Sequence, residues 1–214
     1  RPADINKNYQ PEVEVVGNIP DALERIMDKA ARLQEPVPFL NLRKRMVEEH
    51  ESYAQDLSYP VKPQKALIDC RRVMDKDDIV ISDVGANKVW IARHYNCYKP
   101  NTCIISNGFA TMGLAVPGAI AAKLVHPDRK VLAITGDAGF MMNCQEFETA
   151  HRLGTNFVTL IFNDRSYGLI KWKQDMQYGH HEYVDFTNPD FVKFAESMGL
   201  PATASKRRKT CCRR

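Results

Sequence analysis

From residue 79 onward, short apolar runs alternate with polar turns and with segments of helical character. Each run is too short for a helix and is bounded by turn residues, which predicts strands. These predicted strands cover residues 79–82, 103–105, 130–135 and 157–162. Helices are predicted between and after them, over residues 87–94, 112–124 and 144–153. Repeated strand–turn–helix units predict an α/β fold with a doubly wound, mainly parallel sheet and helices on both faces.

The pattern before residue 79 is different. Residues 12–16 alternate in part between apolar and acidic side chains, which predicts a strand. Pro20 opens a predicted helix over residues 21–33, with Leu23, Ile26 and Ala30 on one face. Residues 35–59 are charged, first helical and then irregular, and residues 65–74 predict a further helix.

Composition narrows the functional classes. The net charge is +4, but residues 205–214 carry six cations and no acid, and removing them leaves −2 for the remaining chain. A nearly neutral body does not indicate a nucleic-acid-binding surface. No apolar run approaches the ~18 residues of a membrane span, and no signal peptide is visible. The six cysteines form no paired CxxC set, which favours a reduced cytosolic protein over a zinc protein.

Small or polar residues follow each predicted strand, in the pairs Asp83/Gly85, Asn107/Gly108, Asp137/Gly139 and Asn163/Asp164. In open α/β sheets, ligands bind beside the carboxyl ends of the strands. Such residues also make ordinary tight turns. Four turns in register, three of them with an aspartate, favour a binding site over turns alone.

Asp137 and Asp164 indicate the kind of ligand. Small residues after Asp137 allow backbone amides to approach an anion such as a phosphate, which two carboxylates alone would repel. A divalent cation between them removes the conflict, since Mg²⁺ prefers carboxylate, phosphate and water oxygens. The backbone carbonyl of Ser166 is a candidate third oxygen ligand.

This arrangement resembles the cofactor motif of thiamine-diphosphate-dependent enzymes, usually written GDG followed after some two dozen residues by NN. Here Gly136-Asp-Ala138 is followed by Asn163-Asp164, with Asp164 27 positions after Asp137. Ala138 replaces the last glycine and Asp164 the last asparagine, and both keep the required size or oxygen. Residues 83–94, 106–113, 145–150 and 167–170 resemble the acetolactate synthases within this family, and the resemblance covers about residues 1–201.

The resemblance implies a role for each matching position. Mg²⁺ would be held by Asp137, Asp164 and the carbonyl of Ser166. Met112 would support the thiazolium ring, with Ala110 and Thr111 beside it. Leu169, Ile170 and Lys173 would face the substrate, although core packing explains Met112, Leu169 and Ile170 equally well. The residues expected around thiamine diphosphate are completed by Gly85, Ala86, Asn87, Ala138, Gly139, Tyr167, Gly168 and Leu169.

The implied activity is that of an acetolactate synthase, in which thiamine diphosphate supplies the carbanion chemistry that decarboxylates pyruvate and joins the product to a second 2-keto acid. Such a reaction serves branched-chain amino acid or acetoin formation. The activating glutamate of that family belongs to an N-terminal domain, so a second subunit with a pyrimidine-binding domain is the expected partner and this chain alone is expected to be inactive. A related 2-keto acid decarboxylase or carboligase, or an inactive remnant, is the alternative. The expected compartment is the cytoplasm, or the chloroplast in a plant.

The same resemblance divides the chain into the end of a central domain (1–35), a linker (36–64), the domain that binds thiamine diphosphate and Mg²⁺ (65–201), and an aberrant basic tail (202–214). A back-translation of residues 201–214, read two bases later, gives Gly-Tyr-Arg-Val-Glu-Thr-Ala-Glu-Asp-Leu-Leu-Pro-Thr, as expected for the family, so a frameshift is predicted. A nucleic-acid-binding tail is the alternative.

Two other features allow two readings. His180, His181 and Glu182 are interpreted as a surface loop rather than a metal site, because adjacent histidines point apart in most backbones. Trp172 is either part of a substrate channel or a packed aromatic side chain.

Overall fold

The computed structural model describes residues 10–30 and 39–205 and divides the chain into two compact units, 1–45 and 46–214. The first unit contains helix α1 (Ile19–Lys29), which begins where Asn18 Oδ1 accepts a hydrogen bond from the amide of Asp21 and Pro20 occupies the first turn. The expected helix at Pro20 is confirmed, and residues 31–33 of its predicted range lie outside the described residues. Leu23 and Ile26 are exposed.

The strand predicted over residues 12–16 is wrong. This segment has no regular secondary structure, and Val13 is 77% exposed. A strand needs a neighbour to pair with its backbone groups, and residues 10–30 contain no other strand that could pair with this segment.

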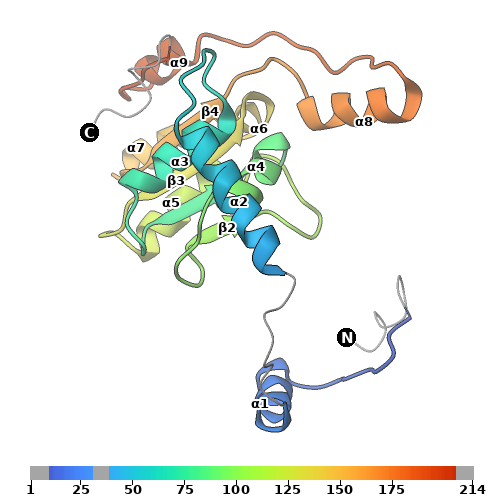
Figure 1. Ribbon diagram of the computed structural model, residues 1–214. Helices are drawn as coiled ribbons and strands as arrows, with labels where there is room; N and C mark the ends of the chain where they lie inside the picture. The colour runs from blue at the N-terminus through green and yellow to red at the C-terminus, as the bar shows by residue number, and fades with distance from the viewer. Residues whose placement is uncertain (1–9, 31–38, 206–214) are drawn as a thin grey trace. The chain divides into compact units, whose positions relative to one another are not determined.

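The second unit is built on a four-stranded parallel sheet in the order β2-β1-β3-β4, which confirms the predicted α/β fold (Figure 1). The strands are β1 (Ile79–Ser82), β2 (Cys103–Ile105), β3 (Val131–Gly136) and β4 (Val158–Phe162). Each lies within two residues of its predicted range. Among the described strands, β2 and β4 form the edges of the sheet.

Helices cover both faces of this sheet, and the strands alternate between them. Val80, Leu132 and Ile134 pack toward Leu67 of α3 and Ile91 of α4. On the other face, neighbouring strand residues such as Ile81 and Ala133 pack against α5 through Ala115 and Ala119. Alternation with a period of two places successive side chains on opposite faces, so both faces of the strands are apolar. Beyond α1, the described residues form the helices α2 (Phe39–Ala54), α3 (Pro63–Val73), α4 (Ala86–His94), α5 (Ala115–Val125), α6 (Asp137–Met142), α7 (Glu146–Arg152), α8 (Gly168–Tyr178) and α9 (Phe191–Ser197).

Two helices differ from the sequence-based ranges. The helix predicted over 112–124 begins only at Ala115, because Gly113 adopts a left-handed φ of +84° just before it. The helix predicted over 144–153 is α7, and a separate short helix, α6, starts directly at Asp137. No helix of the described residues is long and apolar enough to cross a membrane.

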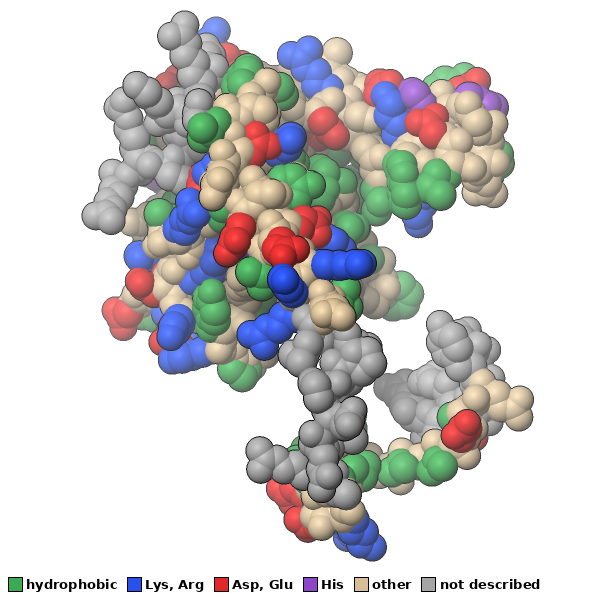
Figure 2. All heavy atoms as spheres, viewed as in Figure 1, with side chains coloured by type: hydrophobic (Ala, Val, Ile, Leu, Met, Phe, Trp, Pro, Cys, Tyr) green, Lys and Arg blue, Asp and Glu red, His purple; other side chains and the backbone are tan. Residues whose placement is uncertain are grey.

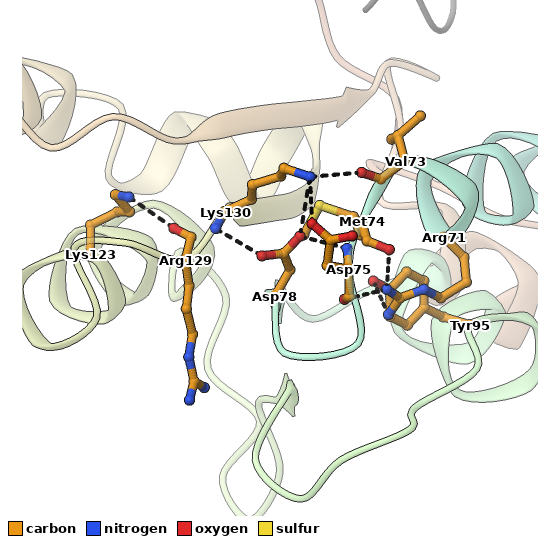
Figure 3. A network of polar contacts seen from close by, with 9 residues as sticks. All are labelled: Arg71, Val73, Met74, Asp75, Asp78, Tyr95, Lys123, Arg129 and Lys130. Atoms are coloured by element: carbon orange, nitrogen blue, oxygen red, sulfur yellow. Dashed lines mark hydrogen bonds and ion pairs between the residues drawn. The ribbon is translucent and has the colours of Figure 1, made fainter.

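At the amino ends of the strands, Asp78 ties β1 to β3 (Figure 3). Its Oδ1 accepts from the backbone amide of Lys130 at 2.9 Å, and its Oδ2 accepts from that of Asp75 at 2.6 Å. The Lys130 ammonium lies 2.9 Å from Asp75 Oδ2 and 3.7 Å from Asp78 Oδ2. Asp78 is buried, so these donors stabilise a carboxylate that would otherwise lose its hydration. The opposite, carboxyl ends of the strands remain available for a site.

Candidate functional site

The chain changes direction at β1, since β2 lies on one side of it and β3 on the other. In doubly wound sheets, this switch point opens a crevice at the carboxyl ends of the strands. A cavity of 1640 Å³ includes this edge and continues along β4 to residues 155–158. Most of the residues that the resemblance assigned to cofactor and substrate line it, while Thr111 and Lys173 do not: the lining includes Gly85, Ala86, Asn87, Ala110, Met112, Asp137, Ala138, Gly139, Asp164, Ser166, Tyr167, Gly168, Leu169 and Ile170.

The turn after β1 needs a glycine at position 85. Gly85 has a φ of +148°, and a Cβ there would lie 2.7 Å from Asn87 Oδ1. Asn87 is held in turn by a hydrogen bond from its Nδ2 to the carbonyl of Asp83. A Cβ on Gly136 would lie 4.0 Å from the same Asn87 oxygen, so the turns after β1 and β3 are close neighbours. Helix α4 starts here with no side-chain cap and no acidic residue in its first turn.

The carboxylate of Asp83 is used inside the fold. Its Oδ1 accepts from the amides of Val84 and Gly113, at 2.7 and 2.9 Å, and its Oδ2 accepts from Ala115 N at 3.2 Å. The Thr135 hydroxyl donates to Oδ2 at 3.3 Å. Asp83 is 1% exposed. Asp83 therefore positions the loop that carries Met112, while Gly85, Ala86 and Asn87 of the same turn line the cavity.

Asp137 is buried but keeps a free coordination direction. Its Oδ1 accepts only from the amide of Ala138, at 2.8 Å. Its Oδ2 accepts from the amide of Arg165 and from Asn188 Nδ2, both at 2.6 Å. A carboxylate offers about four lone-pair positions. The described donors use three, and the fourth lies on Oδ1.

Asp164 follows β4 and lines the same cavity as Asp137. Partial burial of its carboxyl group, and then the charge of Asp137, raise the pKa of Asp164, although part of the residue is exposed. Its Oδ1 accepts from the amide of Ser166 at 3.3 Å. A Cβ on Gly168 would lie 2.9 Å from Oδ2, so the Asp164 carboxylate lies against the start of α8. Two like charges in one cavity repel unless a cation separates them.

The donors present suit a hard divalent cation. Asp137, Asp164 and the Ser166 carbonyl offer only oxygen, and no described backbone amide donates to that carbonyl. The described residues hold no cluster of three or more His, Cys, Asp or Glu side chains fit for a metal. Mg²⁺ does not need one, because it is commonly held by one or two carboxylates with phosphate oxygens and water.

The loop that carries the predicted thiazolium support lies over this cavity. Met112 and Ala110 are half-buried, and Ala110 has a positive φ of 50°. Thr111 is exposed, and its hydroxyl donates to the carbonyl of Met112. Thr111 is therefore a residue of the loop surface rather than of the cavity wall.

The predicted substrate side lies on α8, which has no buried residue. Leu169 is half-buried, Ile170 is 48% exposed and Lys173 is exposed. Trp172 is 56% exposed, so it is not a packed aromatic side chain within the described chain. Apolar side chains of this helix reach the surface in Figure 2, beside charged ones. His180 is exposed and His181 Nδ1 lies 2.7 Å from Asp175 Oδ1, in agreement with the predicted surface loop.

Two asparagines at the site were not predicted as site residues. Asn188 Nδ2 donates to Asp137 Oδ2 and, at 3.0 Å, to Asn163 Oδ1. Asn163 was recognised only as a strand-end residue. No local sequence signal marks Asn188, because its partner Asp137 lies 51 positions away along the chain.

Known proteins have sequences similar to that of this chain. Residues 83–211 match the family model described as "Thiamine pyrophosphate enzyme, C-terminal TPP binding domain". The chain is 36% identical to an acetolactate synthase of Bacillus subtilis (strain 168), over 92% of this chain and 35% of the relative. It is 34% identical to a probable acetolactate synthase large subunit of Methanococcus aeolicus, over 94% of this chain and 37% of the relative. It is 32% identical to the mitochondrial acetolactate synthase catalytic subunit of Saccharomyces cerevisiae, over 97% of this chain and 31% of the relative. The chain thus spans about a third of the length of these relatives.

Proposed function

Since this chain belongs to the thiamine pyrophosphate enzymes, with their C-terminal cofactor-binding domain, we propose that its cavity holds thiamine diphosphate and Mg²⁺ as part of an acetolactate synthase. One observation carries the cofactor proposal. Two carboxylates, Asp137 and Asp164, line one cavity beside helix starts that no side chain caps.

Different residues bind the cation, the diphosphate and the keto acid. Asp137 Oδ1, the carboxylate of Asp164 and the carbonyl of Ser166 hold the cation, which neutralises the repulsion between the two aspartates. The first-turn amides of α4 and α8 have no side-chain partner and hold the negative diphosphate. Gly85 and Gly168 keep Cβ atoms out of the space beside these groups. Leu169 and Ile170 form the apolar side toward the keto acid.

The bound cofactor would supply the electron sink for decarboxylation of a 2-keto acid. The described lining of the cavity contains no glutamate, which is the residue expected to activate the cofactor. We therefore assign activity to an assembly in which a second subunit contributes a pyrimidine-binding domain. Pyruvate and a second 2-keto acid are the proposed substrates, on the strength of the acetolactate synthases that this chain resembles.

Calorimetry of the full 214-residue chain tests the cofactor proposal. Thiamine diphosphate should bind only with Mg²⁺ present, and Asp137→Ala should abolish the heat of binding. Asp77→Ala is the matched control, because Asp77 is an exposed aspartate that pairs with Lys99 before β1, at the other end of the sheet. Metal-independent binding, or equal binding by Asp137→Ala, would overturn the proposal. The chain alone should form no acetolactate from pyruvate.

A further inference from the structure

Residues 184–188, named the strap here, run antiparallel to the loop that contains Asp164 and Ser166. The amide of Tyr167 donates to the carbonyl of Val184 at 2.9 Å, and the amide of Phe186 donates to that of Arg165 at 3.0 Å. Ser166 and Asp185 are bridge partners between these bonds. Val184 is buried, and the Tyr167 and Phe186 rings lie 5.0 Å apart. The strap therefore fixes the backbone on both sides of Ser166.

This pairing has a consequence for Ser166 itself. In the antiparallel bridge, residues 165 and 167 direct their backbone groups toward the strap, so the carbonyl of Ser166 points away from it. Arg165 has a left-handed φ of +59°, which an arginine rarely adopts without support. Its amide is held by Asp137 Oδ2 and its carbonyl by the strap. These hydrogen bonds hold the bent loop in place and leave the carbonyl oxygen of Ser166 without a described backbone donor.

Asn188 extends the same contact to the buried carboxylate. Its Nδ2 lies 2.6 Å from Asp137 Oδ2 and 3.0 Å from Asn163 Oδ1. A carboxylate oxygen can only accept, so the amide nitrogen, not the oxygen, must face Asp137. This leaves Asn188 Oδ1 buried with no partner among the described residues. An unpaired buried acceptor is destabilising, so stability alone does not account for an asparagine here.

We propose that Asn188 is a positioning residue for the cation: together with the amide of Arg165 it saturates Asp137 Oδ2, so that Asp137 binds the metal through Oδ1 alone. The inference rests on the proposed cofactor site. Without Asn188, one lone pair of Oδ2 becomes free and the carboxylate can rotate away from its geometry. Loss of such an outer hydrogen bond weakens metal binding about 10–100-fold in proteins.

Mn²⁺ titration of the full chain with thiamine diphosphate, followed by the electron paramagnetic resonance of free Mn²⁺, tests this. Asn188→Ala should weaken Mn²⁺ binding at least ~10-fold. Thr187→Ala should leave it unchanged, because Thr187 is exposed on the same strap and makes no described contact with the site. No Mn²⁺ binding by the wild type would overturn the proposed function. Binding by the wild type with equal affinity in Asn188→Ala would overturn the role of Asn188 alone.

Hydrogen exchange without metal separates the positioning of Asp137 from a general loosening of the strap. The wild-type amide of Arg165 should exchange slowly, and Asn188→Ala should speed that amide but not the amide of Tyr167, which donates to Val184, while Thr187→Ala should speed neither. Exchange of the wild-type Arg165 amide at the rate of an unprotected peptide would overturn the proposal, whether or not Asn188→Ala folds.

Discussion

Asp83→Ala should strongly destabilise the fold. The side chain is 1% exposed and accepts from the backbone amides of Val84, Gly113 and Ala115. Gly113 and Ala115 are themselves buried, so removal of the carboxylate leaves two donors without a partner and without water. Each such group costs about 1–3 kcal/mol, which gives a total loss of about 2–6 kcal/mol.

That loss is large against the ~5–15 kcal/mol by which domains are usually stable. With a urea slope of about 2 kcal/mol per M, the midpoint of unfolding should fall by ~1–3 M. Urea titration followed by circular dichroism measures it, and Asp77→Ala, an exposed aspartate that pairs with Lys99, is the matched control. The reasoning is refuted if the two variants have the same midpoint. Faster exchange of the Gly113 amide in Asp83→Ala would further show that the loop carrying Met112 depends on this carboxylate.

Three further predictions concern Gly85, Asp78 and Asp164. Gly85→Ala places a Cβ 2.7 Å from Asn87 Oδ1 at a φ of +148°, and should lower the free energy of unfolding by about 1–3 kcal/mol in thermal melts; an unchanged melt contradicts the described turn. Asp78→Ala removes the acceptor of the Lys130 and Asp75 amides and should cost ~2 kcal/mol or more in the same assay, whereas wild-type stability would show that these donors find other partners. Burial and Asp137 raise the pKa of Asp164, so the metal-free folded chain holds this proton more tightly than the unfolded chain; its stability should decline as pH rises from 3.8 through the raised pKa. Asp164→Asn should remove that decline in urea titrations across this pH window, and an identical profile for the two proteins would count against the assigned repulsion.

The strands were predictable because their signal is local. Residues 79–82 and 157–162 are short apolar runs that end in turn residues, and the observed β1 and β4 differ from these ranges by at most one residue. The same rule failed over residues 12–16, where the local pattern is similar but residues 10–30 contain no second strand. A strand requires a partner in space, which a local pattern does not contain.

The sequence by itself determined the fold class and the positions of Asp137, Asp164 and Ser166, because strand-end placement and motif spacing are properties of the chain. The tertiary structure decided how each oxygen is used. It directs the carboxylate of Asp83 inward to Gly113 and Ala115, leaves one lone pair on Asp137 and places Thr111 and Lys173 away from the cavity wall. It also brings Asn188 onto Asp137 across 51 positions. Hydrogen bonds depend on distances of about 3 Å between atoms, and only the folded chain sets those distances.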